Sequence, residues 1–446
     1  MNIIIAGDGE LGFHLAKLLS KEKHNITIVD PHKDLLEMLE ALSDLMTIAG
    51  DSTSFEVLKS ANVHKADLLI AVVHDEQVNL LTAMIGKKLG AKKTIARVNT
   101  VEYLRTENAS NFKELGVDYM VCPERIAANE IVRLLQHTIT TGVYDFSDQK
   151  LSVFLVKVEE HFQLIGKKLE DLALENPNLS FRAVAIERNY NTIIPTGKDV
   201  IQKGDMIYVV VKPKGIDELI RLMGKERIEI KDVIIAGAGR IGRIAAKNLE
   251  KEFNIKLIDN DKKRCQMFSD QFQKTLIICG DVRDVELLED EGIRGTDAYI
   301  AVTNDSETNI LSCLLAKKMG VKKTIALVEN MNYIEMADNM GIDTILNKKL
   351  ISAGHIVSYT SQAQLSSVQF LHTSNAEMME YVVKENSRAT KYPISKLKFP
   401  KGAIIGGIIR NNESYIAVDS FQILAGDRVV IFAQPKEVEN VQKYFI

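Results

Sequence analysis

The sequence predicts an α/β fold in which two doubly wound parallel sheets are each followed by a small α+β domain. Three observations support this prediction. A Gly-x-Gly-x-x-Gly motif follows a short apolar run at residues 7–12 and again at residues 237–242. Behind each copy, short apolar segments alternate with helical patterns, which is typical of parallel strands joined by helices. Farther along each half, alternating apolar segments between Asn-rich and Gly-Asp turns predict antiparallel strands.

Length and repetition together predict four domains. A chain of 446 residues is too long for a single core, since domains are commonly about 100–150 residues long. We expect nucleotide-binding domains at residues 1–137 and 231–361, with α+β domains at residues 138–223 and 362–446. The stretch between the halves, 214–232, combines a short helical pattern with charged residues and is predicted to be a tether.

Composition excludes several functional classes. The net charge is −4, with 46% hydrophobic and 26% charged residues, which argues against a nucleic-acid partner. The longest apolar runs have strand length, so no membrane span is predicted. A strand is expected to begin at Asn2, which leaves no place for a secretory signal. The four cysteines lack the spacing of a metal or redox site and are expected to be buried, reduced thiols of a cytoplasmic protein.

The three glycines of each loop have distinct expected roles in binding a dinucleotide. Gly7 permits a tight turn, Gly9 lets a pyrophosphate approach the backbone, and Gly12 lets the helix pack on the strand. The phosphates then face the free N–H groups at the start of the helix. One such motif is weak evidence, but two in matching contexts strongly indicate two nucleotide sites.

An acidic residue ends the second strand of each half. Asp30 follows Gly12 by 18 positions, and Asp259 follows Gly242 by 17. Such a carboxylate can accept hydrogen bonds from a ribose and repel a 2′-phosphate, which favours NAD or an adenine nucleotide over NADP. Alternatively, each Asp is the N-cap of the next helix. Recurrence at matching distances favours ribose binding.

The repeat extends through the whole of each nucleotide-binding half. Nine of twelve residues are identical between residues 87–98 and 317–328, at an offset of 230 positions. The Gly50-Asp51-Ser52 segment corresponds to Gly280-Asp281-Val282. Because ligands bind at the carboxyl ends of parallel strands, Gly7, Asp30, Asp51, His74 and Arg97 are expected to lie at one edge of the first sheet.

The two sites are not equivalent in charge. Arg97 could reach a pyrophosphate or stack on an adenine, or it could be a solvated strand-end side chain; its counterpart is Leu327. Asp8 and Glu10 place negative charge in the first loop, where the second has Ala238 and Arg240. Arg240 could pair with a pyrophosphate.

Few residues could carry catalysis. His74 is the one candidate acid–base group in the first cleft, and its counterpart is Asn304. Asp75 and Glu76 are adjacent carboxylates at a strand end and are expected to form a solvated turn. The sequence has no helical pair of histidines at metal-ligand spacing, no nucleophile elbow and no Walker loop. A nucleotide that is sensed rather than consumed fits this pattern.

The order of these motifs, with an α+β domain after each set and the whole set present twice, resembles the regulatory subunits of Trk potassium uptake systems. That family carries two tandem RCK (regulator of potassium conductance) units, each a Rossmann-like domain followed by an α+β domain of the RCK C-terminal type. The resemblance covers nearly all of the chain. It implies a homotetramer that forms a ring of eight RCK units, peripheral on the inner face of the cell membrane beneath a separate potassium pore subunit. Nucleotides in the clefts gate the pore.

The resemblance also implies the binding residues, which are here carried over by position. The first site comprises Gly7, Asp8, Gly9, Glu10, Leu11, Gly12, Asp30, Asp51, Ser52, Val73, His74 and Arg97, and the second comprises Gly237, Ala238, Gly239, Arg240, Ile241, Gly242, Asp259, Asp281, Val282, Thr303, Asn304 and Glu329. NAD(H) in one site and ATP or ADP in the other are compatible with these residues. The differences at Arg97 and in the first loop leave open which nucleotide each site takes.

Two other functions remain open at this point. The glycine motifs also fit an NAD-dependent dehydrogenase with a duplicated dinucleotide-binding domain, although a catalytic group is missing. A degenerate cleft that serves only assembly is the second alternative.

Overall fold

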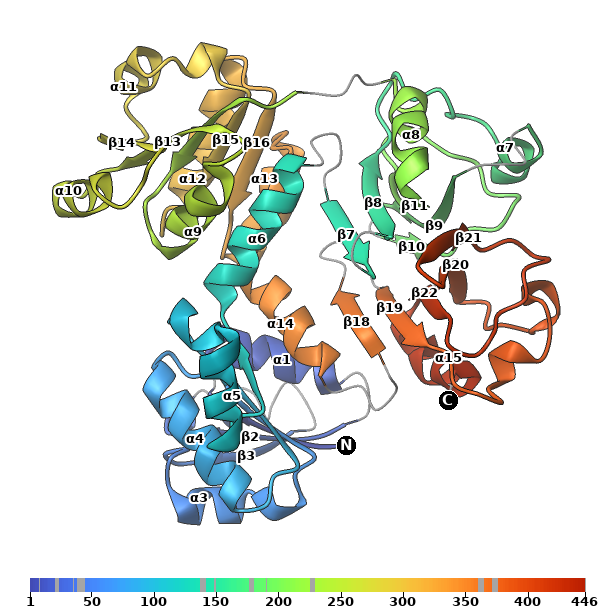
Figure 1. Ribbon diagram of the computed structural model, residues 1–446, viewed down its shortest axis with the longest axis horizontal. Helices are drawn as coiled ribbons and strands as arrows, with labels where there is room; N and C mark the ends of the chain where they lie inside the picture. Colours follow the sequence, from blue (N-terminus) through green and yellow to red (C-terminus); the bar gives the residue numbers. More distant parts are fainter. Residues whose placement is uncertain are drawn as a thin grey trace. The chain divides into compact units, whose positions relative to one another are not determined.

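The computed structural model contains four sheets, two parallel and two antiparallel (Figure 1). It describes residues 1–7, 9–20, 24–34, 36–37, 45–136, 142–147, 150–175, 180–189, 191–224, 229–359, 365–370 and 376–445. The chain divides into two compact units. Unit 1 comprises Met1–Ile126 and Lys348–Gln362, and unit 2 comprises Ala127–Asn347 and Ala363–Ile446. The boundaries of the four domains remain predictions.

Unit 1 is built on a six-stranded parallel sheet in the order β3-β2-β1-β4-β5-β6. Its strands are β1 (Asn2–Ala6), β2 (Asn25–Asp30), β3 (Met46–Ala49), β4 (Leu68–Ala71), β5 (Lys93–Arg97) and β6 (Tyr119–Val121). Its helices include α1 (Glu10–Ser20), α3 (Phe55–Ser60), α4 (Glu76–Lys88) and α5 (Thr106–Glu114). The strand order reverses between β1 and β4, so the sheet is doubly wound, as predicted.

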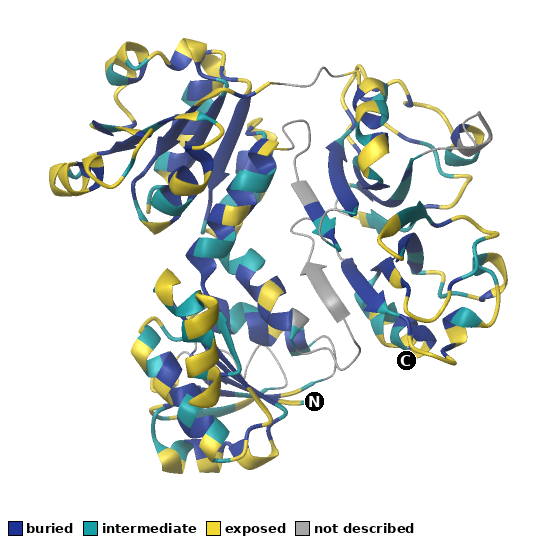
Figure 2. Ribbon diagram, in the orientation of Figure 1, coloured by how far each residue is buried: buried dark blue, intermediate teal, exposed yellow. Residues whose placement is uncertain are grey.

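Both faces of this sheet are covered by helices. On one face, Ile4 of β1 packs in a cluster with Leu58 of α3 and Ile85 of α4. Ile5, the next residue of β1, points to the other face and lies beneath Gly12 of α1. Burial on both faces explains why β1 and β4 are continuous apolar runs rather than alternating ones. Figure 2 shows these strands as buried.

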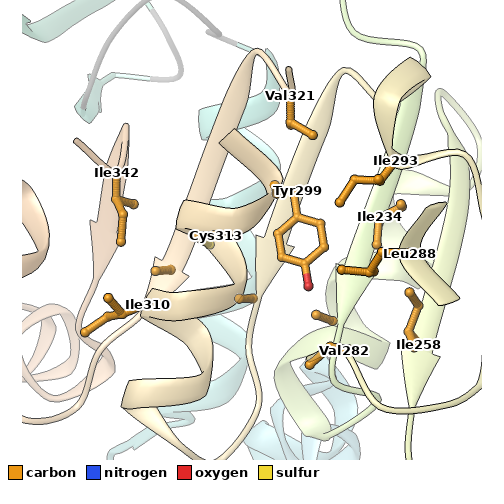
Figure 3. Packing of buried hydrophobic residues seen from close by; sticks show 14 of the residues in the cluster. Ile234, Ile258, Val282, Leu288, Ile293, Tyr299, Ile310, Cys313, Val321 and Ile342 are labelled. Atoms are coloured by element: carbon orange, nitrogen blue, oxygen red, sulfur yellow. The ribbon is translucent and has the colours of Figure 1, made fainter. Parts of the chain in front are cut away.

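The parallel sheet of unit 2 repeats this topology, in the order β14-β13-β12-β15-β16-β17. Its strands are β12 (Asp232–Ala236), β13 (Asn254–Asp259), β14 (Leu276–Cys279), β15 (Ala298–Ala301), β16 (Lys323–Leu327) and β17 (Thr344–Leu346). Its helices include α9 (Arg240–Leu249), α10 (Lys262–Ser269), α11 (Val285–Asp290), α12 (Ser306–Lys318) and α13 (Met331–Asn339). Figure 3 shows one side of the core, where Tyr299 of β15 lies fully buried beside Leu288 and Cys313.

Two helices that follow the parallel sheets lie partly or wholly outside the unit of their own repeat. Helix α14 (Lys348–Ser358) follows the second sheet in the chain but belongs to unit 1, where it contacts α1. Helix α6 (Pro123–Gln136) follows the first sheet, and its residues from Ala127 onward belong to unit 2. There, Asn248 of α9 donates to the side-chain oxygen of Asn129 at 3.5 Å. These neighbours were not predicted from the sequence.

Two five-stranded antiparallel sheets form the rest of unit 2. One has the order β10-β9-β11-β8-β7 and the other β18-β19-β22-β20-β21. Their strands are β7 (Gly142–Phe146), β8 (Leu151–Lys157), β9 (Phe181–Arg188), β10 (Asn191–Ile193), β11 (Met206–Val211), β18 (Leu365–Phe370), β19 (Glu377–Val382), β20 (Ala403–Arg410), β21 (Glu413–Ile416) and β22 (Arg428–Ala433). With helices α7 (Leu169–Glu175), α8 (Ile216–Leu222) and α15 (Val438–Phe445), they confirm the predicted α+β layout.

An equivalent Arg–Asp ion pair, with a buried carboxylate, is present in each antiparallel sheet. Arg188 donates to both carboxylate oxygens of Asp205 at 2.7 Å, and Arg410 does the same to Asp427 at 2.7 and 2.8 Å. The two sheets also share a core, in which the rings of Tyr208 and Phe432 lie 5.4 Å apart. The two α+β modules are therefore packed against each other.

Candidate nucleotide-binding sites

The glycine loops have the geometry that phosphate binding requires. Gly7 and Gly237 have φ values of 118° and 108°, which only glycine adopts readily. A Cβ atom at Gly12 would lie 2.0 Å from the carbonyl oxygen of Gly7, and one at Gly242 would lie 2.0 Å from that of Gly237. These glycines let helix and loop approach closely.

The middle glycine of each loop differs from the other two because it has free space. A Cβ atom at Gly9 or Gly239 would meet no atom within 4 Å. The protein itself therefore does not require glycine there. An anion that approaches the backbone at the start of the following helix would require it, since a side chain would occupy the same space.

The carboxylate of Asp259 ties the second glycine loop to the sheet. Its Oδ2 atom accepts a hydrogen bond of 2.7 Å from the backbone N–H of Ala238, and Oδ1 accepts one from Asp261. Asp261, not Asp259, is the N-cap of α10, since its side chain accepts from Lys263 and Arg264. In the second copy, the helix-capping role therefore belongs to Asp261, two positions after Asp259. A ribose contact by Asp259 remains a prediction.

Asp30 occupies the equivalent strand end in the first module and is buried. Its Oδ1 atom accepts from the backbone N–H of His32 at 3.0 Å and lies 2.7 Å from Nδ1 of the same residue. The loop residue Asp8 lies outside the described residues, as does the side chain of Glu10. The expected negative charge of the first loop is therefore a statement about the sequence alone.

The second module has a cavity of about 420 Å³ at the carboxyl ends of its strands. It brings together seven of the residues expected in this site, namely Gly237, Gly239, Asp259, Asp281, Val282, Thr303 and Asn304. Ala238, Ile241 and Gly242 are buried beside the loop, and Arg240 is exposed at the start of α9. The backbone N–H of Glu329 donates to Ser306 at 3.0 Å. Seven of the twelve predicted residues thus line one cleft, and the other five, Glu329 among them, are not part of its lining.

Several arginines gather at this second cleft, and sequence reasoning singled out only Arg240. Arg264 and Arg283 line the cavity. Arg264 lies 3.5 Å from Asp259, and Arg283 lies 2.6 Å from Asp281. Arg243 stacks on the ring of Phe268, with its guanidinium carbon 4.5 Å from the ring centroid.

Arg243 is not fully satisfied by the protein. Its Nε atom is buried without a hydrogen-bond partner. Burial lowers the pKa of Arg243, and the positive charges of Arg240 and Arg264 lower it further. Three guanidinium groups are therefore close enough to repel one another, and a bound polyanion would relieve that repulsion.

A direct comparison of the two copies could have revealed this asymmetry. The positions equivalent to Arg240, Arg243 and Arg283 are Glu10, Phe13 and Thr53. Each lies 230 positions earlier in the chain. The sequence signal was the change in residue type at matching positions rather than any motif.

The expected residues of the first cleft have mixed environments. Asp51 accepts hydrogen bonds from the backbone and side chain of Thr53, which lower its pKa. Ser52 is buried, and its hydroxyl lies 2.9 Å from that of Thr82. Leu11 is buried and His74 is exposed. Ser52 and Leu11 are therefore buried in the module, while the side chains of Asp51 and His74 remain accessible to a ligand.

Arg97 turns its guanidinium toward the start of α6. Its Nη2 atom lies 4.0 Å from Oε1 of the buried Glu124, and its Nε atom is buried without a partner. This side chain is therefore neither fully solvated nor fully satisfied by the protein. A donor in this state fits an anionic ligand at the strand ends.

A buried asparagine braces the strand ends in both modules, and sequence reasoning missed it. The side chain of Asn79 on α4 accepts from the N–H of Val73 and donates to the carbonyl oxygens of Val73 and Arg97. Asn309 on α12 makes the same contacts with Thr303 and Leu327. The sequence could have indicated this role, because Asn79 and Asn309 occupy equivalent positions of the repeat.

The adjacent carboxylates Asp75 and Glu76 have structural partners. Asp75 is the N-cap of α4 and accepts from Gln77 and Val78. Glu76 accepts hydrogen bonds from the backbone N–H groups of Asn99 and Thr100. Among the residues that the structure describes, no group of His, Cys, Asp or Glu side chains could hold a metal ion, and no helix is long and apolar enough to cross a membrane.

Comparison with known families identifies both kinds of module. The TrkA-N domain matches residues 3–123 and 233–348, and the TrkA-C domain matches residues 153–224 and 378–446. A Trk system potassium uptake protein TrkA homolog of Methanosarcina mazei is 33% identical over the full length of both chains. TrkA of Halomonas elongata is 30% identical over all of this chain and 98% of its own length.

Solved structures confirm the fold. A GsuK channel bound to NAD superimposes with a TM-score of 0.61 at 18% identity, over 100% of this chain and 78% of the channel. The GsuK RCK domain gives a TM-score of 0.61 at 19% identity, over 99% of this chain and 94% of that structure. At these identities the likeness supports the arrangement of strands and helices, and not a ligand.

Proposed function

The chain belongs to the family of Trk system potassium uptake proteins TrkA, and we propose that it is the nucleotide-sensing regulatory subunit of such a system. One observation carries this proposal, namely the presence in one chain of two glycine-loop clefts at the carboxyl ends of two parallel sheets. The family match confirms the resemblance found in the sequence. It also favours regulation over the alternative of a duplicated dehydrogenase.

We infer that the first cleft takes NAD(H) and the second takes ATP or ADP. Arg264 and Arg283 line the second cleft, and Arg240 and Arg243 lie on α9, which follows its glycine loop. Guanidinium groups are well suited to phosphate oxygens. A nucleoside di- or triphosphate carries more negative charge than the pyrophosphate of NAD. The first loop has Asp8 and Glu10 instead, which disfavours extra phosphates and leaves Arg97 as the arginine for a pyrophosphate.

A regulatory role also agrees with what the two clefts lack. A hydride-transferring enzyme needs a proton-transfer group beside the nicotinamide. His74 is exposed at the first cleft, and Asn304 stands in its place at the second. We therefore propose that the chain binds its nucleotides without turnover and acts on potassium flux through a separate membrane pore subunit, at the inner face of the cell membrane.

Exposed apolar side chains support assembly into a ring. Leu81 on α4 and Leu311 on α12 are 48% and 61% exposed, and they occupy equivalent positions. On α13 and just after it, three methionines (331, 336 and 340) are also exposed. Contiguous exposed apolar residues commonly mark interaction surfaces. We propose that these helices associate with other copies of the chain to form a homotetramer with eight RCK units.

Substitutions at the middle glycines test the sensing function directly. Gly9→Ala and Gly239→Ala add one methyl group where the protein has space, so folding should be retained while nucleotide binding is blocked. In liposomes that contain a Trk-type pore subunit, nucleotide should change potassium flux only with the unsubstituted chain. The double variant should be insensitive. Gly295→Ala is a matched control, since its Cβ atom also meets nothing within 4 Å and it lies outside the cleft lining.

The same preparations separate the sensor from an enzyme. NADH absorbance should stay constant when the chain is incubated with small hydroxy, keto and amino acids. Steady NADH oxidation that disappears in the Gly9→Ala variant would instead support the dehydrogenase. Flux that responds equally to nucleotide in the double variant would overturn the proposed role of the clefts.

A further inference from the structure

Two cysteines of the second module lie close together beside the acidic strand end. Cys265 is on α10, and Cys279 is the last residue of β14. The sheet register pairs Cys279 with Asp259 on the neighbouring strand. The Cys265 thiol contacts the carbonyl oxygen of Asp259 at 3.2 Å and that of Ile278 at 3.8 Å. Its sulfur therefore lies beside both the strand partner of Cys279 and the residue that precedes Cys279.

The pair combines an accessible thiol with a buried one. Cys279 is exposed, so the expectation of buried thiols is wrong for this residue, whereas Cys265, Cys122 and Cys313 are buried. Burial, together with Cys279, Asp259 and Asp261, raises the pKa of Cys265 to about 11. Cys265 is therefore protonated at neutral pH and protected from reagents in solution, while Cys279 is open to them.

The first module has no such pair at the equivalent positions. Leu36 corresponds to Cys265, since each donates its backbone N–H to the residue two positions after the acidic strand end. Ala49 corresponds to Cys279, because it pairs with Asp30 as Cys279 pairs with Asp259. The topology therefore accepts a leucine and an alanine here, and packing alone does not require two cysteines.

We propose that Cys265 and Cys279 form a reversible disulfide on exposure to a peroxide, and that this bond weakens nucleotide binding in the second cleft. The thiolate of Cys279 attacks one peroxide oxygen to give a sulfenic acid, and hydroxide leaves and is protonated to water. The sulfur of Cys265 then attacks the sulfenic sulfur, and a second water leaves with the Cys265 proton. Two thiols are oxidised to one disulfide, while hydrogen peroxide is reduced to two waters.

Formation of this bond must move α10. A disulfide needs the two sulfurs about 2.05 Å apart, whereas the Cys265 sulfur lies against the carbonyl oxygens of Asp259 and Ile278. Cys265 also loses the proton that it directs toward the carbonyl oxygen of Asp259. Arg264 is the adjacent residue on α10 and lines the cleft, 3.5 Å from Asp259. Closing the bond therefore displaces an arginine that we assign to polyphosphate binding.

Peptide mapping tests the disulfide without reference to any nucleotide. The full chain is treated with hydrogen peroxide, blocked with an alkylating reagent and digested. The expected product is one cross-linked species that contains Cys265 and Cys279, with two of the four thiols lost and both recovered by a dithiol reductant. Persistence of a free Cys265 while Cys279 proceeds to sulfinic acid would overturn the proposal.

Calorimetry with ATP tests the coupling, which rests on the proposed function of the second cleft. Oxidation should weaken ATP binding by about fivefold or more, in the usual range of coupling between sites. The variant Cys265→Leu/Cys279→Ala, which copies the residues of the first module, should bind ATP equally with and without peroxide. An oxidised, cross-linked chain with unchanged ATP affinity would overturn the coupling. A failure of the reduced chain to bind ATP would overturn the nucleotide assignment instead, while the peptide map would still decide whether the disulfide forms.

Discussion

At the residue scale, the two clefts share one fold but differ in the charged side chains around them. Asp30 and Asp259 end equivalent strands and are both buried, but their surroundings differ. Arg264 lies beside Asp259, whereas His32 is the neighbour of Asp30. Arg264 thus places a positive group beside Asp259 that is available to phosphate. We propose that these differences around a common acidic residue separate the nucleotide preferences of the two clefts.

Removal of the acidic side chain should affect one site at a time. Asp30→Ala should weaken NADH binding about tenfold or more, because hydrogen bonds to a charged group contribute roughly 1.5–3 kcal/mol. ATP binding at the second cleft should be unchanged in this variant. Calorimetry with each nucleotide gives the affinities, and a melting curve gives the stability. Loss of thermal stability with full NADH affinity would show that Asp30 serves only the local fold.

At the element scale, helix α4 and its counterpart α12 do more than cover the sheet. Each carries a buried asparagine whose amide joins the ends of two strands, through Val73 and Arg97 in one module and Thr303 and Leu327 in the other. In each sheet the first of these two strands, β4 or β15, lies at the topological switch, where the cleft forms. The helix therefore sets the positions of cleft residues that are far from it in sequence.

Loss of this brace should destabilise the module. Asn79→Ala leaves one buried N–H group and two carbonyl oxygens without their partner, and each such group costs roughly 1–3 kcal/mol. Urea unfolding should show a free energy of unfolding lower by about 2 kcal/mol or more. Asn108→Ala is the matched control, since the Asn108 side chain makes one exposed contact with Glu102. It should change stability by less than about 0.5 kcal/mol. Equal effects of the two substitutions would contradict a bracing role for Asn79.

At the scale of the whole molecule, the repeat is not a simple tandem of independent halves. Helix α14 comes from the second half of the chain and packs on α1 in unit 1. The two α+β modules share one core, where Gly406 leaves room for Val184 and Val210. Stability of one repeat thus depends on the other.

Assembly should depend on the exposed apolar residues of the α4 and α12 helices. Replacing Leu81 and Leu311 together by lysine places charge at these two surfaces and should shift the ring toward smaller species. Light scattering at micromolar concentration measures the mass. Leu424→Lys is a control at a residue of similar exposure in an α+β module, and it should leave the mass unchanged. A stable monomer of the unsubstituted chain would contradict the ring itself.

The sequence by itself determined the fold class, the repeat and the positions of both glycine loops. These features follow from local rules, because glycine spacing, apolar runs and turn residues act over a few neighbouring positions. The positive φ values of Gly7 and Gly237 and the strand order of both sheets agree with that reasoning.

Only the tertiary structure decided which surfaces and side chains meet. An amphipathic helix specifies that one face is buried, but not which partner covers it, so the place of α14 on α1 could not be read from its pattern. The same holds for the arginines around the second cleft and for the pair of Cys265 and Cys279. These residues are separated along the chain, and folding alone brings them together.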